Sequence, residues 1–207
     1  MGRGPAPGAD PVRRGGGSWL VLLCVVPGLA LAGLVRKANP ETGLVGWKFD
    51  RGAFELEIVQ RLPDQTRAFF LARGFPAAEA DRLAVHCVMQ TIVRNTGRPG
   101  EAPPIRVDLR EWRVAHGGTI RPLRHKEAWL AEWAKTGAVP PPARIAFRWS
   151  TLPTEQVYEP RGDYNWGMTI YDLPPGSRFD LYVVWHAGAR RHAAWVRGLE
   201  CAPDRHE

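Results

Sequence analysis

The fold is decided near the C-terminus by the stretch FDLYVVWHAGARRHAAWVRGLEC, residues 179–201. Two runs rich in aromatic and aliphatic residues, 179–186 and 192–201, flank a short segment from Ala187 to Arg190 that contains Gly188. Strand-like runs joined by a short glycine-containing segment predict a β-hairpin. The last third of the chain is therefore expected to be antiparallel β-structure.

The same two-residue period recurs closer to the N-terminus. In residues 54–60, Phe54, Leu56 and Ile58 alternate with Glu55 and Glu57, which is typical of a half-buried strand. Further strands are expected at residues 43–49, 88–95, 105–114, 119–123, 144–150, 156–158 and 166–171. Helices are expected at residues 65–73, from Pro76 onward, and at residues 126–135.

Together these elements predict an α+β fold. Its main part is an antiparallel β-sandwich or sheet of roughly seven to nine strands, with two or three short helices packed at one side, after an N-terminal apolar export segment. The chain of 207 residues is long enough for one sizeable core, and no internal repeat requires a second domain.

The N-terminus has the features of an export signal. Arg13 and Arg14 precede an uncharged apolar run over residues 19–35, within which Ala30-Leu31-Ala32 forms an A-x-A cleavage site. An uncleaved membrane anchor is the alternative, because the run is just long enough to span a bilayer and Arg36-Lys37 follows it. Both alternatives place the rest of the chain outside the cytoplasm.

The predicted organisation has four parts. They are a disordered basic tail (1–17), a signal peptide or membrane anchor (18–35), a linker (36–42) and a single extracytoplasmic β-rich domain (43–207). The expected location is the periplasm, or the inner membrane with the C-terminal domain outside the cytoplasm. Association with a membrane is expected through residues 18–35.

The cysteines support an oxidising compartment. Cys24 lies in the apolar segment, so the exported part contains Cys87 and Cys201. An even number of cysteines in an exported domain predicts a disulfide. Two free thiols, or Cys87 as a metal ligand, are the alternatives.

The charge argues against one class of partner. The formal net charge is +7, but the arginines are spread singly among prolines and acidic residues. Nucleic-acid-binding proteins concentrate such charge in a patch or block, so no nucleic acid is expected. A mild attraction to anionic headgroups or acidic partners is all that this charge supports.

One short cluster contains soft metal ligands. His86, Cys87 and Met89 offer an imidazole, a thiolate and a thioether, a set that suits copper and above all Cu(I). A complete site would need Met168, or a histidine such as His186, from elsewhere in the fold. The alternative is a face of a buried helix with Cys87 in the disulfide. No other cofactor is predicted.

A polar and aromatic segment near residues 156–168 is the candidate binding surface, because loops on a rigid scaffold often carry function. In the alternative interpretation, the polar side chains cap turns and Trp166 fills the core. The candidate binding residues are Gln156, Asp163, Tyr164, Asn165 and Trp166.

Nine tryptophans are many for a chain of this length. Trp149, Trp185 and Trp195 fall on expected strands at positions that should face inward. Trp129 and Trp133 share one face of an expected helix. That pair forms either part of the core or a docking patch for a membrane or a partner.

No catalytic motif is present. Ser150, His186 and Asp163 could form a triad, but no G-x-S-x-G surrounds the serine, and no catalytic residue is predicted. The sequence favours an exported, non-enzymatic binding or assembly accessory to an envelope protein. A copper-handling periplasmic protein and a hydrolase of unknown substrate that uses His186 are the alternatives.

Overall fold

The structure is a computed structural model that describes residues 1, 2, 4 and 33–204. The predicted basic tail (1–17) and the apolar segment up to residue 32 fall almost entirely outside these residues. Among the residues described, no helix has both the length and the apolar character needed to cross a bilayer.

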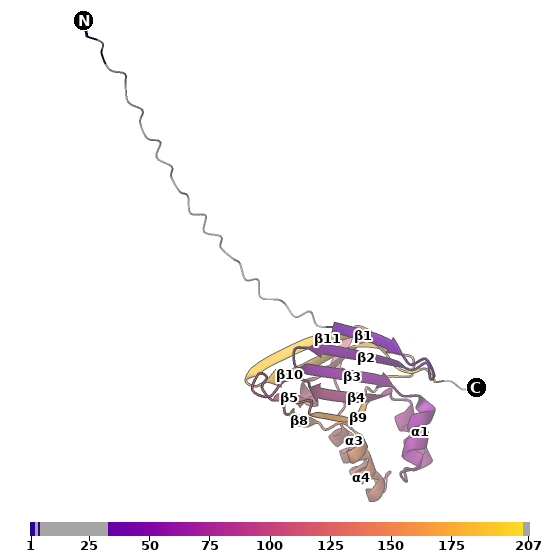
Figure 1. Ribbon diagram of the computed structural model, residues 1–207. Coiled ribbons are helices and arrows are strands. Elements are labelled where there is room, and N and C mark those ends of the chain that lie inside the picture. Colours follow the sequence, from indigo (N-terminus) through magenta and orange to yellow (C-terminus); the bar gives the residue numbers. More distant parts are fainter. Residues whose placement is uncertain (3, 5–32, 205–207) are drawn as a thin grey trace.

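The described domain contains two antiparallel sheets, of five and six strands. The first has the order β1-β2-β3-β4-β9, from β1 (Gly33–Ala38), β2 (Val45–Arg51), β3 (Phe54–Gln60), β4 (Val88–Asn95) and β9 (Tyr164–Ile170). The second has the order β7-β6-β10-β5-β8, with β11 also paired to β10. Its strands are β5 (Ile105–Asp108), β6 (Arg113–His116), β7 (Thr119–Pro122), β8 (Glu155–Tyr158), β10 (Arg178–Ala187) and β11 (Arg190–Glu200). The predicted α+β fold is confirmed (Figure 1), and so is the C-terminal hairpin, which is β10–β11.

The two sheets enclose the main hydrophobic core. Phe54, Leu56 and Ile58 are completely buried there, as the two-residue period predicts. Trp185 comes from the other sheet, and its ring stacks on Phe54 with centroids 4.4 Å apart. Stacked aromatic pairs stabilise a fold beyond what the burial of their apolar surface provides, so this contact helps to hold the sheets face to face.

Four helices form a second layer on the outer face of the five-stranded sheet. They are α1 (Pro63–Leu71), α2 (Ala77–Ala84), α3 (Lys126–Thr136) and α4 (Pro141–Ser150), and a short 3-10 helix, η1, covers Leu109–Glu111. Their apolar side chains form a second core with Val88, Met168 and Ile170 of β4 and β9. The helices lie at the β9 side of this sheet, where they cover the ends of β4 and β9 near Val88 and Ile170 and leave the face over β1–β3 open (Figure 1).

The strand expected at residues 144–150 is wrong, because this segment is helix α4. Ile145, Phe147 and Trp149 alternate like a strand, yet only Phe147 is buried, together with Ala143 one turn earlier. The preceding prolines do not prevent a helix, since proline is accepted in the first turn and Pro141 begins this one. Trp149 consequently points to solvent.

The linker expected at residues 36–42 is also wrong in its first half. Residues 33–38 form strand β1, which pairs with β2 from Gly33 opposite Asp50 to Ala38 opposite Val45. The sequence GLVRKA has no strand-like alternation, so its extended conformation follows from pairing with β2. The folded domain thus begins at residue 33, ten residues earlier than expected.

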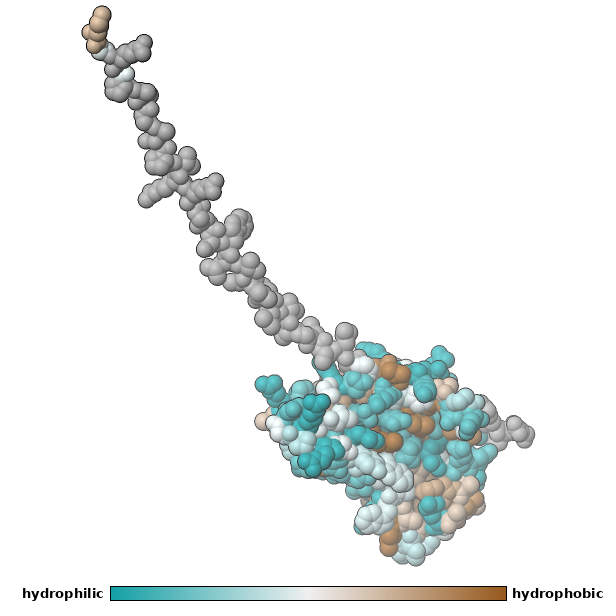
Figure 2. Space-filling view, viewed as in Figure 1, coloured by the Kyte–Doolittle hydropathy of each residue, from teal (hydrophilic) through white to brown (hydrophobic). Residues whose placement is uncertain are grey.

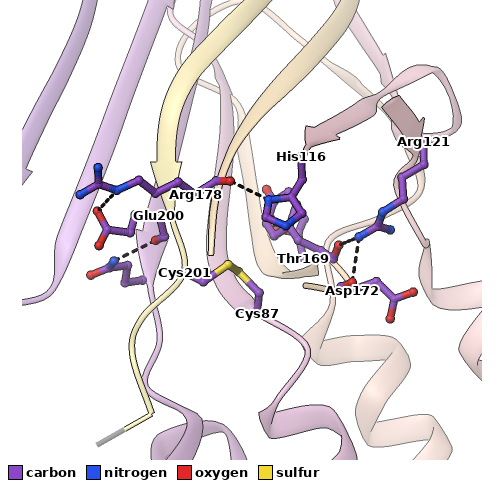
Figure 3. The surroundings of a disulfide bond; sticks show 10 residues. Cys87, His116, Arg121, Thr169, Asp172, Arg178, Glu200 and Cys201 are labelled. Carbon is purple, nitrogen blue, oxygen red and sulfur yellow. Dashed lines mark hydrogen bonds and ion pairs between the residues drawn. A yellow bond between two sulfur atoms is a disulfide. The ribbon is translucent and has the colours of Figure 1, made fainter. Parts of the chain in front are cut away.

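The predicted disulfide is confirmed. Cys87 lies just before β4 and Cys201 just after β11, and their sulfur atoms are bonded (Figure 3). Both residues are buried in the main core. Close by, the Gln60 side chain donates a hydrogen bond to the Glu200 carbonyl at 2.8 Å. The disulfide therefore joins the two sheets at the end of the sandwich where the C-terminal segment leaves β11.

Candidate functional site

The candidate site is the open end of the outer sheet face, on β9. Side chains alternate along a strand, so Tyr164, Trp166, Met168 and Ile170 share this outer face. Met168 and Ile170 are covered by the helices. Tyr164 and Trp166 lie beyond them, with exposed fractions of 53% and 58%. We call these two rings the β9 aromatic pair.

The backbone explains why the helical cover stops at this point. After α4, Thr151 pairs with Met168 in a parallel bridge, and the Leu152 N–H donates to the Met168 carbonyl at 3.1 Å. A Cβ on Gly167 would lie 2.2 Å from the Leu152 nitrogen, so only glycine permits this crossing. The chain then leaves the outer face, and the strand on the N-terminal side of Gly167 remains uncovered.

A row of charged side chains borders the aromatic pair. Arg94 on β4 lies opposite Tyr164, with its guanidinium carbon 4.9 Å from the ring centroid. Arg94 also reaches Glu55 at 3.5 Å, and Glu55 binds Lys48 at 2.8 Å. The hydrogen bond from Lys48 to Glu55 raises the pKa of Lys48. The rings therefore stand beside side chains that already have partners of opposite charge.

Three of the five predicted binding residues form local hydrogen bonds between β8, β9 and the turn that joins them. Asn165 Nδ2 donates to Gln156 Oε1 at 2.7 Å, and Asn165 Oδ1 accepts the Trp166 N–H at 2.8 Å. Asp163 Oδ2 accepts the Glu159 N–H at 2.9 Å, which closes the turn between β8 and β9. These hydrogen bonds of Gln156, Asp163 and Asn165 fix the segment that presents Tyr164 and Trp166.

The structure does not bring the four predicted copper ligands together. Cys87 is bonded to Cys201, and the Nδ1 atom of His86 lies 2.7 Å from Asp172 Oδ1. Met89 is buried in the main core, whereas Met168 is buried in the helical core on the other face of the same sheet. Within residues 33–204, no group of three or more His, Cys, Asp or Glu side chains could hold a metal ion.

The residues considered for a triad are equally separate. Ser150 Oγ donates to the Phe147 carbonyl at the end of α4. His186 Nε2 pairs with Glu111 Oε2 at 2.8 Å, while Asp163 serves the β8–β9 turn. The three side chains therefore have three different sets of partners.

The tryptophan predictions have mixed outcomes. Trp185 is buried, as expected, and Trp195 is half-buried. Trp129 and Trp133 are completely buried in the helical core, so of the two alternatives for this pair the core is correct and the docking patch is excluded. Their spacing does place them on one face of α3, but that face packs against the other helices and the sheet.

A charged cluster that the sequence does not reveal surrounds Trp129. The guanidinium carbons of Arg82 and Arg124 lie 4.9 and 3.8 Å from the Trp129 ring centroid. Glu132, one turn along α3, binds both arginines. Burial opposes ionisation of Glu132, but the hydrogen bonds from these arginines outweigh it and lower the pKa of that carboxyl. No signal in the sequence marks this set, because its members come from separate elements.

His86 joins the same cluster from the end of α2. Its ring packs edge-on to Trp129 at 5.4 Å. Burial lowers the pKa of His86, the Asp172 carboxylate opposes this shift, and the guanidinium of Arg124 adds to it. The contacts of His86 with Trp129 and Asp172 fasten the helical layer to the loop after β9.

Comparison with known protein families, with curated proteins and with solved structures gave no match. What the site can do therefore follows from its own geometry and chemistry.

Proposed function

We propose that the protein is an exported, non-enzymatic binding or assembly accessory whose β9 aromatic pair captures a protein partner in the cell envelope. The observation that carries the proposal is the exposure of Tyr164 and Trp166 on a strand whose next two outward residues are fully covered. Tyrosine and tryptophan, with arginine, are the side chains that dominate binding energy at protein interfaces.

The chemistry beside the rings favours a protein over a sugar. A sugar ring requires polar groups that converge on its hydroxyls. Here the Gln156 and Asn165 side chains are hydrogen-bonded to each other, and Arg94 lies between Glu55 and the Tyr164 ring. What remains is an exposed aromatic pair with a charged border, which matches the apolar centre and polar rim of a protein interface.

The disulfide supports the proposed location. Stable disulfides belong to oxidising compartments, and the Cys87–Cys201 bond is buried between the sheets. Export through residues 18–32 and oxidation of these two cysteines are consistent with one another. The proposed location is the periplasm, or the outer surface of the inner membrane.

The experiment is site-specific photo-crosslinking in the cells that produce the protein. A photoreactive phenylalanine analogue replaces Trp166, and the adduct is identified by mass spectrometry. The identified protein is then purified and titrated against the parent chain and the Trp166→Ala variant. We expect one discrete adduct, and binding of the purified partner that is at least about tenfold weaker for the variant.

The matched control is Ile120 on β7, which is about as exposed as Trp166 but lies on the other sheet. The analogue at position 120 should give no adduct with the same protein, and Ile120→Ala should bind as tightly as the parent. Equal crosslinking from both positions would mean that the β9 aromatic pair is not the capture surface.

A further inference from the structure

Helix α4 carries apolar side chains on the face that it turns to solvent. Ala143 and Phe147 face the helical core. On the outward side, Ile145 and Trp149 have exposed fractions of 57% and 81%. They are four residues apart, so both side chains lie on the same stripe of the helix.

The charged residues of α4 and of the loop before it have a single sign. Between Glu132 and Glu155 the sequence contains no acidic residue, and its charged residues are Lys135, Arg144 and Arg148. Lys135 and Arg148 are exposed and Arg144 is half-buried. No acidic side chain in the described part of the chain forms an ion pair with any of the three, in contrast to the paired arginines of the Trp129 cluster.

A shallow hollow lies between α3 and α4 beside the stripe. Its volume is about 240 Å³. Apolar and basic side chains from the two helices line it together: Leu130, Ala134, Pro141, Arg144, Ile145 and Arg148. Figure 2 shows apolar residues gathered over the helical end of the molecule, below a sheet face that is mostly hydrophilic.

We propose that this α3–α4 face docks on a membrane surface that contains anionic phospholipid. Basic side chains beside exposed tryptophan and aliphatic residues are typical of helices that lie in the bilayer interface. Tryptophan prefers the headgroup level, and unpaired cations match the negative charge of that surface. The cations alone would also suit an acidic protein, but the exposed Ile145 and Trp149 on the same stripe match the bilayer interface, so a lipid surface is the occupant that charge and apolar exposure together favour.

The position of this face separates it from any N-terminal anchor. The described domain begins at β1, and α3 and α4 lie at the opposite end of the molecule (Figure 1). Docking through α4 would therefore not follow from residues 18–35 remaining in a bilayer. It is also independent of the proposed function, since neither Tyr164 nor Trp166 belongs to the α3–α4 face.

The test measures binding of the purified full chain to vesicles of phosphatidylcholine, with and without an equal part of phosphatidylglycerol. All variants retain residues 1–32, so the contribution of this segment is common to them. Each basic residue at such a surface is worth about a fivefold change in partition. We therefore expect the double variant Arg144→Gln, Arg148→Gln to bind anionic vesicles about thirtyfold more weakly, and Trp149→Ala to bind them several-fold more weakly.

The matched control removes the same charge elsewhere. Arg98 and Arg178 are both highly exposed and have only loose acidic partners, so Arg98→Gln, Arg178→Gln should weaken vesicle binding by less than about fivefold. Equal losses in the two double variants would show that net charge alone drives binding and would overturn the proposal. So would a parent chain that binds both kinds of vesicle equally.

Two further readouts keep the outcomes distinct. The thermal midpoint of each variant should match that of the parent, because Arg148 and Trp149 are exposed and the half-buried Arg144 has no ion pair to lose among the described residues. Trp166→Ala should leave vesicle binding unchanged, and Trp149→Ala should leave partner binding unchanged. If Trp149→Ala abolishes a protein contact and leaves vesicle binding intact, α4 binds protein and the lipid proposal is wrong.

Discussion

The two faces of the five-stranded sheet are used in different ways. The inner face is covered along its length by the second sheet, and its polar side chains are paired there, as in the 2.6 Å contact between the hydroxyls of Thr91 and Thr169. The outer face is covered by helices at one end only. At the other end the same strand, β9, exposes Tyr164 and Trp166.

If the proposed function is correct, this difference separates stability from recognition. Substitutions on the inner face, or under the helices, should cost free energy of unfolding. Substitutions at the open end should cost partner binding and little else. The five expectations below follow this division, from the largest effect on the free energy of unfolding to the smallest.

The largest effect is expected from removing the bond between the sheets. The Cys87–Cys201 disulfide closes a loop with a sequence separation of 114, for which the chain-entropy account gives about 4–5 kcal/mol. The double variant Cys87→Ser, Cys201→Ser should lose about this free energy in denaturant unfolding. Adding reductant should then change the unfolding of the parent but not of the variant. An unchanged parent after complete reduction of the bond would contradict this.

Truncation within each core comes next. Phe54→Ala and Phe147→Ala remove fully buried rings from the main core and the helical core, and each should cost about 3–5 kcal/mol. Hydrogen exchange should distinguish them. Phe54→Ala should speed exchange across both sheets, whereas Phe147→Ala should speed it first in α3 and α4. If hydrogen exchange becomes faster at the same amides in both variants, the helices do not form a separate layer.

The crossing at Gly167 should be the next most sensitive position. In Gly167→Ala the new methyl group would meet the backbone of Leu152, and overpacking of this kind costs about 1–3 kcal/mol. Gly46 on β2 is the control, because a Cβ there meets Val59 at an ordinary 3.4 Å. The midpoint temperature of thermal unfolding should fall clearly in Gly167→Ala and much less in Gly46→Ala. Equal losses would mean that the crossing is not the constraint.

The Trp129 cluster should contribute a smaller, pH-dependent amount. Glu132 is partly exposed, so its charge-assisted bonds should be worth only about 1 kcal/mol. Its folded pKa lies below the ordinary value of 4.5. The contribution is therefore present above that ordinary value and is lost as pH falls through the lowered pKa. Unfolding curves of the parent and Glu132→Gln should differ at pH 7 and converge in acid, and a gap that persists in acid would contradict this assignment.

The smallest effect on stability is expected at the open end. Tyr164→Ala and Trp166→Ala alter side chains that are more than half exposed, so each should change the free energy of unfolding by less than about 0.5 kcal/mol. Chemical denaturation measures this directly. A loss of several kcal/mol would instead place the rings in the structural framework.

The sequence predicted the fold where a single face of an element is buried. The hairpin of β10 and β11 and the alternation in β3 follow this rule. The disulfide follows from the even number of cysteines after the N-terminal apolar segment. Helix α4 was misread because residues 145, 147 and 149 alternate by chance, while Ala143 and Phe147 set the buried stripe. Strand β1 could not be found, since pairing with β2 and not its own composition makes it extended.

The candidate site was predictable only in part. The sequence placed Tyr164 and Trp166 together in one segment with polar neighbours. It could not show that Gln156, Asp163 and Asn165 form local hydrogen bonds, because those bonds depend on how β8 and β9 lie relative to each other. The stacking of Arg94 on Tyr164 joins β4 to β9 across 70 residues of chain, a separation that no local pattern bridges.

The most direct test of the central claim is to measure partner binding and unfolding on the same samples of the parent, Trp166→Ala and Ile120→Ala. The partner is the protein identified by crosslinking at position 166. We predict that Trp166→Ala weakens binding at least about tenfold with an unchanged free energy of unfolding, and that Ile120→Ala changes neither quantity. Undiminished binding by Trp166→Ala, or weakening that merely accompanies a loss of stability, would contradict the assignment of this surface.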